Sequence, residues 1–243
     1  MLEADGLHTA ACSGGRYARQ EMLPEIGHAG QAKLRRAKVM IVGAGGLGSP
    51  VALYLAGAGV GTLTLVDEDV VSLSNLHRQV LYAESEVGTS KVAAAAVRLR
   101  SLNGEVDIRT HACRLTRENA ESLIKGHDVV VDACDNYATR YVLSDACAAL
   151  GIPYIYGAIE GFCGQVAVLC CPPRRRTYRD LFPDEDALRG MTPFKGVVGM
   201  TAAVVGSVQA HEVMKLLCGY GDVLAGRLWT IDLRTMESYA LDI

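Results

Sequence analysis

Six consecutive residues, Gly43 to Gly48, and a carboxylate after them could bind a phosphate-bearing ligand. They read Gly-Ala-Gly-Gly-Leu-Gly, a match to G-x-G-x-x-G. Gly43, Gly45, Gly46 and Gly48 would permit a tight turn whose backbone N–H groups approach phosphate oxygens at a helix N-terminus. Asp67 lies 19 residues after Gly48, where a carboxylate can accept hydrogen bonds from ribose hydroxyls. These residues predict a nucleotide site, and an NAD- or FAD-linked oxidoreductase fits them as well as an ATP-binding enzyme does.

The elements that would position this site follow from apolar runs and helical spacing. Apolar runs predict strands over 38–42, 62–66, 106–110, 128–132, 153–157 and 165–171. Between them we expect helices from the glycine turn to about 58 and over 89–102, 118–125 and 137–150. This alternation is typical of an α/β fold with a Rossmann-like, mostly parallel central sheet and helices on both faces. Beyond 171 we expect an irregular stretch over 172–195, a long helix over 199–217 and C-terminal antiparallel strands over 228–232 and 237–241.

Bulk properties of the 243-residue chain exclude several classes of protein. Half of the residues are apolar and the formal charge is −3, so nothing indicates a nucleic acid or membrane partner. No apolar stretch approaches the roughly 20 residues that a membrane-spanning helix needs. The eight cysteines form no C-x-x-C pair, which argues against a secreted disulfide framework. We therefore expect a soluble, cytoplasmic protein with reduced thiols.

Four polar side chains outside the turn could meet it. Arg19 precedes the first strand, Asn75 and Arg78 follow the second, and Lys91 opens the next helix. Each follows a turn or precedes a helix, so we expect each to point into the crevice at the C-terminal ends of the strands. Two arginines and a lysine suit a triphosphate and its pyrophosphate leaving group better than they suit the two phosphates of a dinucleotide.

Six motifs in a fixed order carry a resemblance to a known family. They are R-Y-x-R-Q at 16–20, G-x-G-G-L-G at 43–48, D-x-D at 67–69, S-x-x-N-L-x-R-Q at 72–79, G-x-x-K at 88–91 and D-x-x-D-N at 132–136. With the helix over 199–217, this order resembles the ThiF/MoeB/HesA family, relatives of the ubiquitin-activating enzymes. The resemblance implies one adenylation domain over 16–243 after a disordered stretch over 1–15. Residues 16–170 would form its nucleotide-binding half, and 171–243 its carrier-binding half with the crossover loop.

The resemblance also implies an activity. Family members use ATP and Mg²⁺ to adenylate the C-terminal glycine of a ubiquitin-like sulfur-carrier protein with a Gly-Gly tail, of the thiamin or molybdopterin type. By the same resemblance, the four glycines would line the nucleotide and Asp67 would bind the ribose. Asn75, Arg78 and Lys91 would hold the phosphates, and Asp135 would bind Mg²⁺. Arg19 would reach the γ-phosphate from the partner subunit, which requires a homodimer. Residues 177–195 would form a mobile loop over the carrier tail.

Two departures from the family pattern concern cysteines. Zinc-containing relatives carry a C-x-x-C pair where this chain has Thr177 to Asp180, so no structural zinc is expected. Several relatives also bond covalently to the carrier through a crossover cysteine, and residues 172–217 contain none. Cys163, Cys171 and Cys218 could replace it, but each abuts an apolar strand or helix and is expected to pack inside. A separate persulfide donor would then deliver the sulfur.

Two alternatives stay open within this resemblance. ATP could activate a different acceptor, such as a peptide or a tRNA adenosine, or the chain could be a non-catalytic nucleotide-binding scaffold. The string Asn-Leu-His-Arg-Gln at 75–79 favours the sulfur-carrier branch. The intact set of Arg19, Arg78, Lys91 and Asp135 favours catalysis, because a scaffold has no need of all four.

Overall fold

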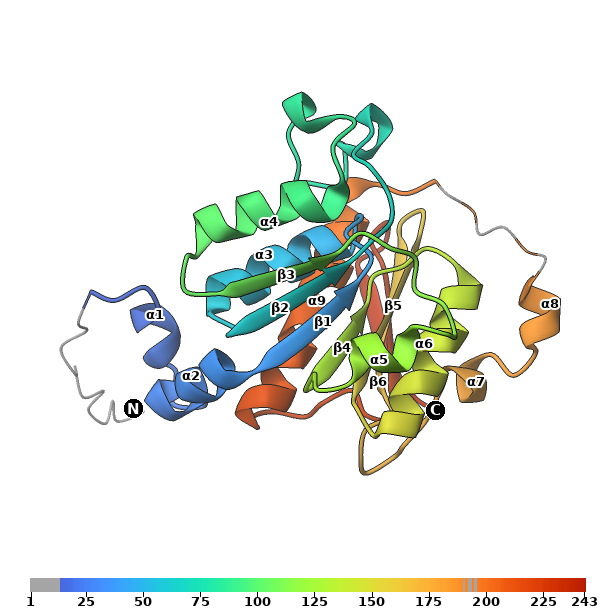
Figure 1. The fold of residues 1–243 in the computed structure, drawn as a ribbon. Helices are drawn as coiled ribbons and strands as arrows, with labels where there is room; N and C mark the ends of the chain where they lie inside the picture. Colours follow the sequence, from blue (N-terminus) through green and yellow to red (C-terminus); the bar gives the residue numbers. More distant parts are fainter. Residues whose placement is uncertain (1–13, 190, 192–193, 195) are drawn as a thin grey trace.

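The computed structural model describes residues 14–189, 191, 194 and 196–243. The disorder predicted over 1–15 therefore falls almost wholly outside the described residues, as do positions 190, 192, 193 and 195 of the predicted loop. The described residues form one mixed eight-stranded sheet with helices packed on it (Figure 1). No helix among them is long and apolar enough to cross a membrane.

The sheet has the strand order β3-β2-β1-β4-β5-β6-β7-β8. Strands β1 to β5 run parallel, and β6, β7 and β8 continue the sheet as an antiparallel extension. The strand bounds are β1 Lys38–Val42, β2 Thr62–Val66, β3 Asp107–His111, β4 Val129–Asp132, β5 Tyr154–Glu160, β6 Cys163–Leu169, β7 Arg227–Asp232 and β8 Glu237–Asp242. The predicted fold class, with its mostly parallel sheet and its C-terminal antiparallel strands, is confirmed.

Helices cover both faces of the parallel part of the sheet. One face carries α2 (Gly27–Arg36), α3 (Gly48–Ala58), α4 (Lys91–Leu102) and the long α9 (Gly199–Cys218), and the other carries α5 (Ala120–Ile124), α6 (Tyr137–Leu150) and α7 (Tyr178–Leu181). The remaining described helices are α1 (Ala18–Glu21), α8 (Glu185–Arg189) and the 3₁₀ turns η1 (Leu73–Asn75) and η2 (Glu84–Glu86). Parallel strands covered on both sides are expected to be apolar at every position, and all five residues of β2 are buried.

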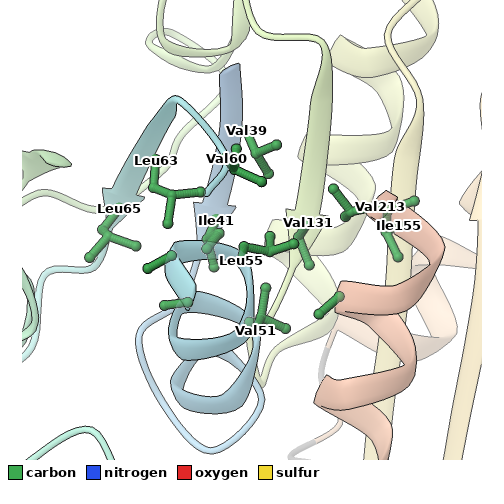
Figure 2. Close-up of a cluster of buried hydrophobic side chains, with 14 of the residues drawn as sticks. Val39, Ile41, Val51, Leu55, Val60, Leu63, Leu65, Val131, Ile155 and Val213 are labelled. Atoms are coloured by element: carbon green, nitrogen blue, oxygen red, sulfur yellow. The ribbon is translucent and has the colours of Figure 1, made fainter. Parts of the chain in front are cut away.

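The core beneath α3 and α9 fixes the helix that starts at the glycine turn. Val51 and Leu55 of α3 pack on Ile41 of β1, and Val213 of α9 packs beside Ile155 of β5 (Figure 2). A fully buried aliphatic side chain contributes about 1.5–3 kcal/mol relative to an exposed one. The N-terminus of α3 is therefore held rigidly over the C-terminal end of β1.

The stretch over 172–195 is more regular than predicted. It contains α7 and α8, which side chains cap at their N-termini. Asp180 accepts hydrogen bonds from the backbone N–H and the hydroxyl of Thr177 at 2.7 and 2.8 Å, and Asp184 accepts from the N–H of Ala187 at 2.9 Å. Such caps stabilise helices too short to show apolar periodicity, which is why the prediction of an irregular stretch was wrong here.

Candidate functional site

A cavity of about 720 Å³ lies at the C-terminal ends of the parallel strands. Residues that end or follow β1, β2 and β4 form its floor, and β5, β6 and β7 form one wall. Seven of the sequence-predicted residues line it: Gly43, Gly45, Gly46, Asp67, Arg78, Lys91 and Asp135. Gly48, Asn75 and Arg19 do not line it.

The glycine turn is locked so that two backbone donors stay free. Ala44 donates its N–H to Asp67 at 2.7 Å, and its carbonyl accepts from the hydroxyl of Tyr82 at 2.7 Å. Within the described part of the chain, the N–H groups of Gly45 and Gly46 donate to no acceptor. Both groups line the cavity one turn before α3, an arrangement that suits an anion.

Two other glycines of the turn act through close packing. Gly43 has φ +96°, and a side-chain carbon there would meet the carbonyl of Ala133. A side-chain carbon at Gly48 would meet the carbonyl of Gly43 itself. The left-handed backbone at Gly43 and the lack of space at Gly48 both require glycine. Gly48 therefore brings α3 against β1 without itself lining the cavity.

Lys91 is buried in the cavity wall beside two carboxylates. Its Nζ lies 2.8 Å from Asp69 Oδ2 and 4.0 Å from Asp67 Oδ1. Asp67 also accepts a hydrogen bond from the N–H of Asp69 at 2.8 Å. Asp67, the carboxylate predicted to bind the ribose, therefore also holds the glycine turn and the loop after β2. Each of its oxygens has a further lone pair with which it can accept a hydrogen bond from a ligand.

Arg78 and Asn75 come from the loop that contains η1, but they contribute differently. Arg78 donates to the carbonyl of Ser74 at 3.1 Å and lies 2.8 Å from His77 Nε2. Across the described ranges it forms no ion pair with a carboxylate, so its charge is free for an anionic ligand. Asn75 accepts backbone N–H groups of Arg78 and Gln79 at its carbonyl and so shapes the loop.

Asp135 is exposed in the cavity, in the loop between β4 and α6. Asn136 caps α6 by accepting a hydrogen bond from the N–H of Thr139 at 2.9 Å, which fixes the direction of the loop. No hydrogen bond or ion pair involves the Asp135 side chain in the part of the chain that the structure describes. Its carboxylate is therefore available to an incoming group.

A buried ion pair between Arg140 and Asp132 lies beside Asp135. The sequence motifs did not identify Arg140 as a residue of the site. Arg140 lies one turn into α6, lines the cavity and places its Nε 3.6 Å from Asp132 Oδ2. Asp132 is fully buried and accepts hydrogen bonds from Tyr154 at 2.6 Å and from the N–H of Cys134 at 3.0 Å. Burial is the largest single influence and would lower the pKa of Arg140, but Asp132 together with Tyr156, Cys134 and Tyr178 raises that pKa well above its usual value.

A sequence signal for Arg140 did exist. It stands five residues after Asp135 on the helix that Asn136 caps, and the first turn of such a helix faces the same crevice as its N-terminus. Its guanidinium also lies over Tyr156, 5.6 Å from the ring centroid, and Tyr156 lines the cavity too. The charged Arg140 and the aromatic ring of Tyr156 therefore lie together in the cavity wall.

Arg19 is a predicted site residue that the structure places at the end of the molecule opposite the cavity. It is exposed on α1, which lies next to α2 (Figure 1). Tyr17, just before α1, bonds to Asn103 and Glu105 after α4, and Gln20 donates to the carbonyl of Ala58 at the end of α3. These contacts hold α1 at the C-terminal ends of the helices, opposite the cavity. The expectation that Arg19 points into its own chain's crevice was wrong.

The cysteines divide into buried and exposed groups. Cys171 and Cys218 are buried as predicted, and burial raises the pKa of both thiols. The prediction that Cys163 packs inside was wrong, because it is exposed and lines the cavity. It is the first residue of β6, and its side chain projects from the sheet face on which Tyr156 also lies. Only the later part of β6 is covered by helices.

The described ranges hold no cluster of three or more histidine, cysteine, aspartate or glutamate side chains arranged to bind a metal ion. At the position of the family's first C-x-x-C pair, Thr177 and Asp180 instead cap α7. A magnesium ion does not require such a cluster, because it is commonly held by one or two carboxylates together with phosphate oxygens and water. Asp135, exposed on the cavity wall, fits that donor set.

Comparisons with known proteins identify the family and the fold of this chain. The ThiF family matches residues 17–243. The chain is 47% identical over 224 residues to a sulfur carrier protein adenylyltransferase from Thermus thermophilus, with 89% of this chain and 82% of that protein covered. It is 42% identical over 234 residues to the probable adenylyltransferase/sulfurtransferase MoeZ from Mycobacterium tuberculosis, with 94% of this chain and 59% of that protein covered.

The solved structure of E. coli MccB with ATP superimposes with a TM-score of 0.83 at 22% identity, covering 96% of this chain and 73% of that one. At this identity the likeness concerns the fold. The family match spans nearly all of the described residues, and the relative from Thermus thermophilus shares almost half of its aligned positions with them. The chain therefore belongs to the ThiF family.

Proposed function

We propose that this protein is an ATP-dependent adenylyltransferase that activates the C-terminal glycine carboxylate of a ubiquitin-like sulfur-carrier protein. One observation carries the proposal: the glycine turn, Arg78, Lys91 and Asp135 all line a single cavity. A relative that is 47% identical is named as a sulfur carrier protein adenylyltransferase, which supports the choice of substrate. The chain spans 59% of the MoeZ relative, so the sulfur-transfer activity in that name is not part of the proposal.

The proposed reaction brings two anions together. A carboxylate oxygen of the carrier attacks the α-phosphorus of ATP, the new O–P bond forms, and the bond to the β-phosphate oxygen breaks to release pyrophosphate. No side chain needs to act as nucleophile, so the protein must supply in-line positioning and neutralise charge. The free N–H groups of Gly45 and Gly46 suit a phosphate, and Asp67 suits the ribose.

Arg78 and Lys91 are proposed to hold the phosphates and to stabilise the departing pyrophosphate. Arg78 is free of carboxylates in the described ranges, and Lys91 is held in place by Asp69. Preorganised charges of this kind need little rearrangement when negative charge develops. Asn75 is proposed to act by shaping the Arg78 loop, since its side chain does not line the cavity.

Asp135 is proposed to hold Mg²⁺ together with the phosphates. When bound there, magnesium would neutralise phosphate charge and so ease attack by a carboxylate. Asp135 is exposed and forms no salt bridge with any residue that the structure describes. This supports the role, because a carboxylate already held in a salt bridge would have to break it first.

The active form is proposed to be a homodimer in the cytoplasm. Arg19 lies away from the cavity of its own chain, so it can serve catalysis only from a second copy. The rim thiol Cys163 is not required for adenylation in this scheme, and a separate persulfide donor would supply sulfur after the acyl-adenylate has formed.

ATP–pyrophosphate exchange tests the proposal directly. Purified protein is incubated with ATP, Mg²⁺, labelled pyrophosphate and each Gly-Gly-terminated ubiquitin-like protein of the source genome. We expect exchange that depends on one such carrier and falls about 100-fold or more in Asp135→Ala. The control Glu84→Ala removes an exposed carboxylate that does not line the cavity and should behave as wild type.

Three outcomes would contradict the proposal. They are exchange that needs no carrier, exchange that survives Asp135→Ala, and thermal stabilisation by NAD in place of ATP. Stabilisation by NAD would instead favour the interpretation of the protein as an oxidoreductase. Exchange that instead needs a short peptide or a tRNA would keep the enzyme class and change the acceptor.

A further inference from the structure

Arg140 is a cation of the cavity wall that has no role in the proposed reaction. Its side chain is 9% exposed, and burying a guanidinium is costly unless protein groups replace the lost water. Its Nη2 donates a hydrogen bond to the carbonyl of Cys134 at 3.2 Å, and its Nε lies 3.6 Å from Asp132 Oδ2. One arginine is therefore tied to two residues of the short segment that leads into Asp135.

The acceptor positions of Asp132 are occupied within the protein. Its Oδ1 accepts hydrogen bonds from the backbone N–H of Cys134 at 3.0 Å and from the thiol of Cys134 at 2.7 Å. Its Oδ2 accepts from the hydroxyl of Tyr154 at 2.6 Å and faces Arg140. Asp132 is fully buried and does not line the cavity, so it anchors the segment and is closed to a ligand.

Asp135 differs from Asp132 in each of these respects. It is exposed and lines the cavity, and no residue that the structure describes bonds to its carboxylate. Both of its neighbours are nevertheless fixed, because Arg140 holds the carbonyl of Cys134 and Asn136 caps α6. The carboxylate is therefore free while the backbone that carries it is held from both sides.

We infer that Arg140 is a positioning residue for the carboxylate of Asp135. It neutralises the buried charge of Asp132 and fixes the carbonyl of Cys134, so that Asp135 alone of the two acidic residues meets the cavity, at a fixed place. This inference rests on the proposed function, in which Asp135 holds Mg²⁺. Groups that orient a metal ligand from behind commonly determine metal affinity, because the ligand must be in place before the ion binds.

Arg140 is poorly placed to bind a phosphate itself. Asp132 offsets its charge, and its guanidinium lies over the rings of Tyr137 and Tyr156, 5.8 and 5.6 Å from their centroids. Aromatic faces stabilise a cation where it stands. Loss of Arg140 should therefore weaken metal binding and leave the binding of metal-free nucleotide almost unchanged.

Two variants separate the charge of Arg140 from its grip on the segment. Arg140→Lys keeps a cation near Asp132, but one ammonium group cannot replace a planar guanidinium that reaches Asp132 and Cys134 together. Arg140→Met combined with Asp132→Asn removes both charges, so that no unpaired charge stays buried. The matched control is Arg100→Met, because Arg100 also donates to a backbone carbonyl, that of Ile108 at 2.7 Å, and does not line the cavity.

The main readout is metal binding at equilibrium, without catalysis. Mn²⁺ is the probe, since it takes the same oxygen ligands as Mg²⁺ and its free form is measured by electron paramagnetic resonance. Each protein is titrated with Mn²⁺ in the presence of a non-hydrolysable ATP analogue, and calorimetry gives the Kd of the analogue without metal. Thermal unfolding of the ligand-free proteins shows that each variant is folded.

We expect the Kd of Mn²⁺ to rise about tenfold or more in both Arg140 variants, with the Kd of the metal-free analogue within about threefold of wild type. In carrier-dependent pyrophosphate exchange, the Mg²⁺ concentration for half-maximal rate should rise in parallel, with the KM for the carrier retained. Arg100→Met should match wild type in all of these measurements.

Two results would overturn the role of Arg140 and leave the proposed function intact. The first is an unchanged Kd of Mn²⁺ in a folded Arg140 variant. The second is an equal loss of affinity for the metal-free analogue, which would mean that Arg140 contacts the nucleotide directly. Wild-type protein that binds Mn²⁺ and the analogue but shows no carrier-dependent exchange would instead remove the proposed acceptor, and the role of Arg140 would stand.

Discussion

Lys91 shows how the cavity wall keeps a buried positive charge in place before any ligand arrives. A buried ammonium without partners loses several kcal/mol of hydration. Asp69 at 2.8 Å and Asp67 at 4.0 Å offset that loss, and Asp67 is itself fixed by the N–H of Ala44. The charge of Lys91 and the position of the glycine turn are therefore set by the same carboxylate.

Replacing Lys91 by methionine should damage catalysis strongly. Lys91→Met keeps most of the aliphatic stem but leaves Asp67 and Asp69 without a cation and removes charge from the phosphate site. We expect kcat in pyrophosphate exchange to fall about 100-fold or more. Lys125→Met is the control, because Lys125 is exposed and does not line the cavity. A Lys91→Met enzyme within about threefold of wild type would contradict the assigned role.

His127 gives the molecule a pH-dependent stability that is unrelated to the cavity. Its Nδ1 lies 3.1 Å from the carbonyl of Ile124 and its Nε2 lies 2.8 Å from Thr64 Oγ1. A carbonyl only accepts, so Nδ1 carries the proton and the neutral ring accepts from the threonine hydroxyl at Nε2. Burial is the main cause that lowers the pKa of His127 from its usual 6.5.

The sign of the effect follows from proton binding. Between the lowered folded pKa and the unfolded value near 6.5, the unfolded chain binds more protons, so acid favours unfolding. We expect the free energy of unfolding to rise with pH up to about 7, and this part of the rise to disappear in His127→Gln. Urea titrations of both proteins at several pH values measure it. An identical slope in the two proteins would refute the assignment.

One face of the helix α9 contacts the glycine turn, the Arg78 loop and the end of β4. Gly199, Ala202, Gly206 and Gln209 are spaced by three or four residues and so share one face of the helix. Gly199 approaches the carbonyl of His77, next to Arg78, and Ala202 packs on Gly46. Gly206 packs on Leu47, and Gln209 donates to the carbonyl of Asp132 at 2.6 Å. A shift of α9 would therefore move the phosphate turn and both loops beside it.

A methyl group on this face should be harmful. In Gly206→Ala the new carbon would lie 2.5 Å from Pro50 Cγ and 2.7 Å from the carbonyl oxygen of Leu47. We expect a loss of about 1–3 kcal/mol in the free energy of unfolding and a higher KM for ATP, because Leu47 belongs to the phosphate turn. The measurements are urea titration and pyrophosphate exchange.

Gly57→Ala is the matched control in α3. No atom lies within 4 Å of a side-chain carbon placed there, so alanine should stabilise the helix by about 0.5–1 kcal/mol. Equal effects of the two substitutions would show that α9 does not press on the turn as the distances indicate.

The strands, the long helices and the phosphate turn could be predicted because local patterns encode them. All of TLTLV is buried, as is KVMIV after its first residue, and Gly43 and Gly48 are required where they stand. Arg19 could not be placed, because hydrogen bonds between Tyr17 and residues more than 80 positions away fix α1. The exposure of Cys163 depends on where helix cover ends on the sheet, which no local pattern records.

The two ends of the molecule carry complementary halves of the proposed active site. The cavity lies at the C-terminal ends of the strands, and Arg19 lies at the opposite end, beside Met22 and Leu23, which are 53% and 51% exposed. Exposed apolar side chains next to an exposed arginine suit contact with another copy. In a symmetric dimer, each α1 would then complete the cavity of its partner.

Mixing two inactive variants tests this arrangement. Arg19→Ala removes the group donated to the partner, and Lys91→Ala removes one retained in the chain's own cavity. In a mixed dimer, the cavity of the Arg19→Ala chain keeps Lys91 and receives an intact Arg19. Random re-association of equal amounts should therefore restore about a quarter of wild-type exchange, since half of the dimers are mixed and each has one complete site. Mixtures that stay inactive, although the subunits demonstrably exchange, would mean that Arg19 does not act across the dimer.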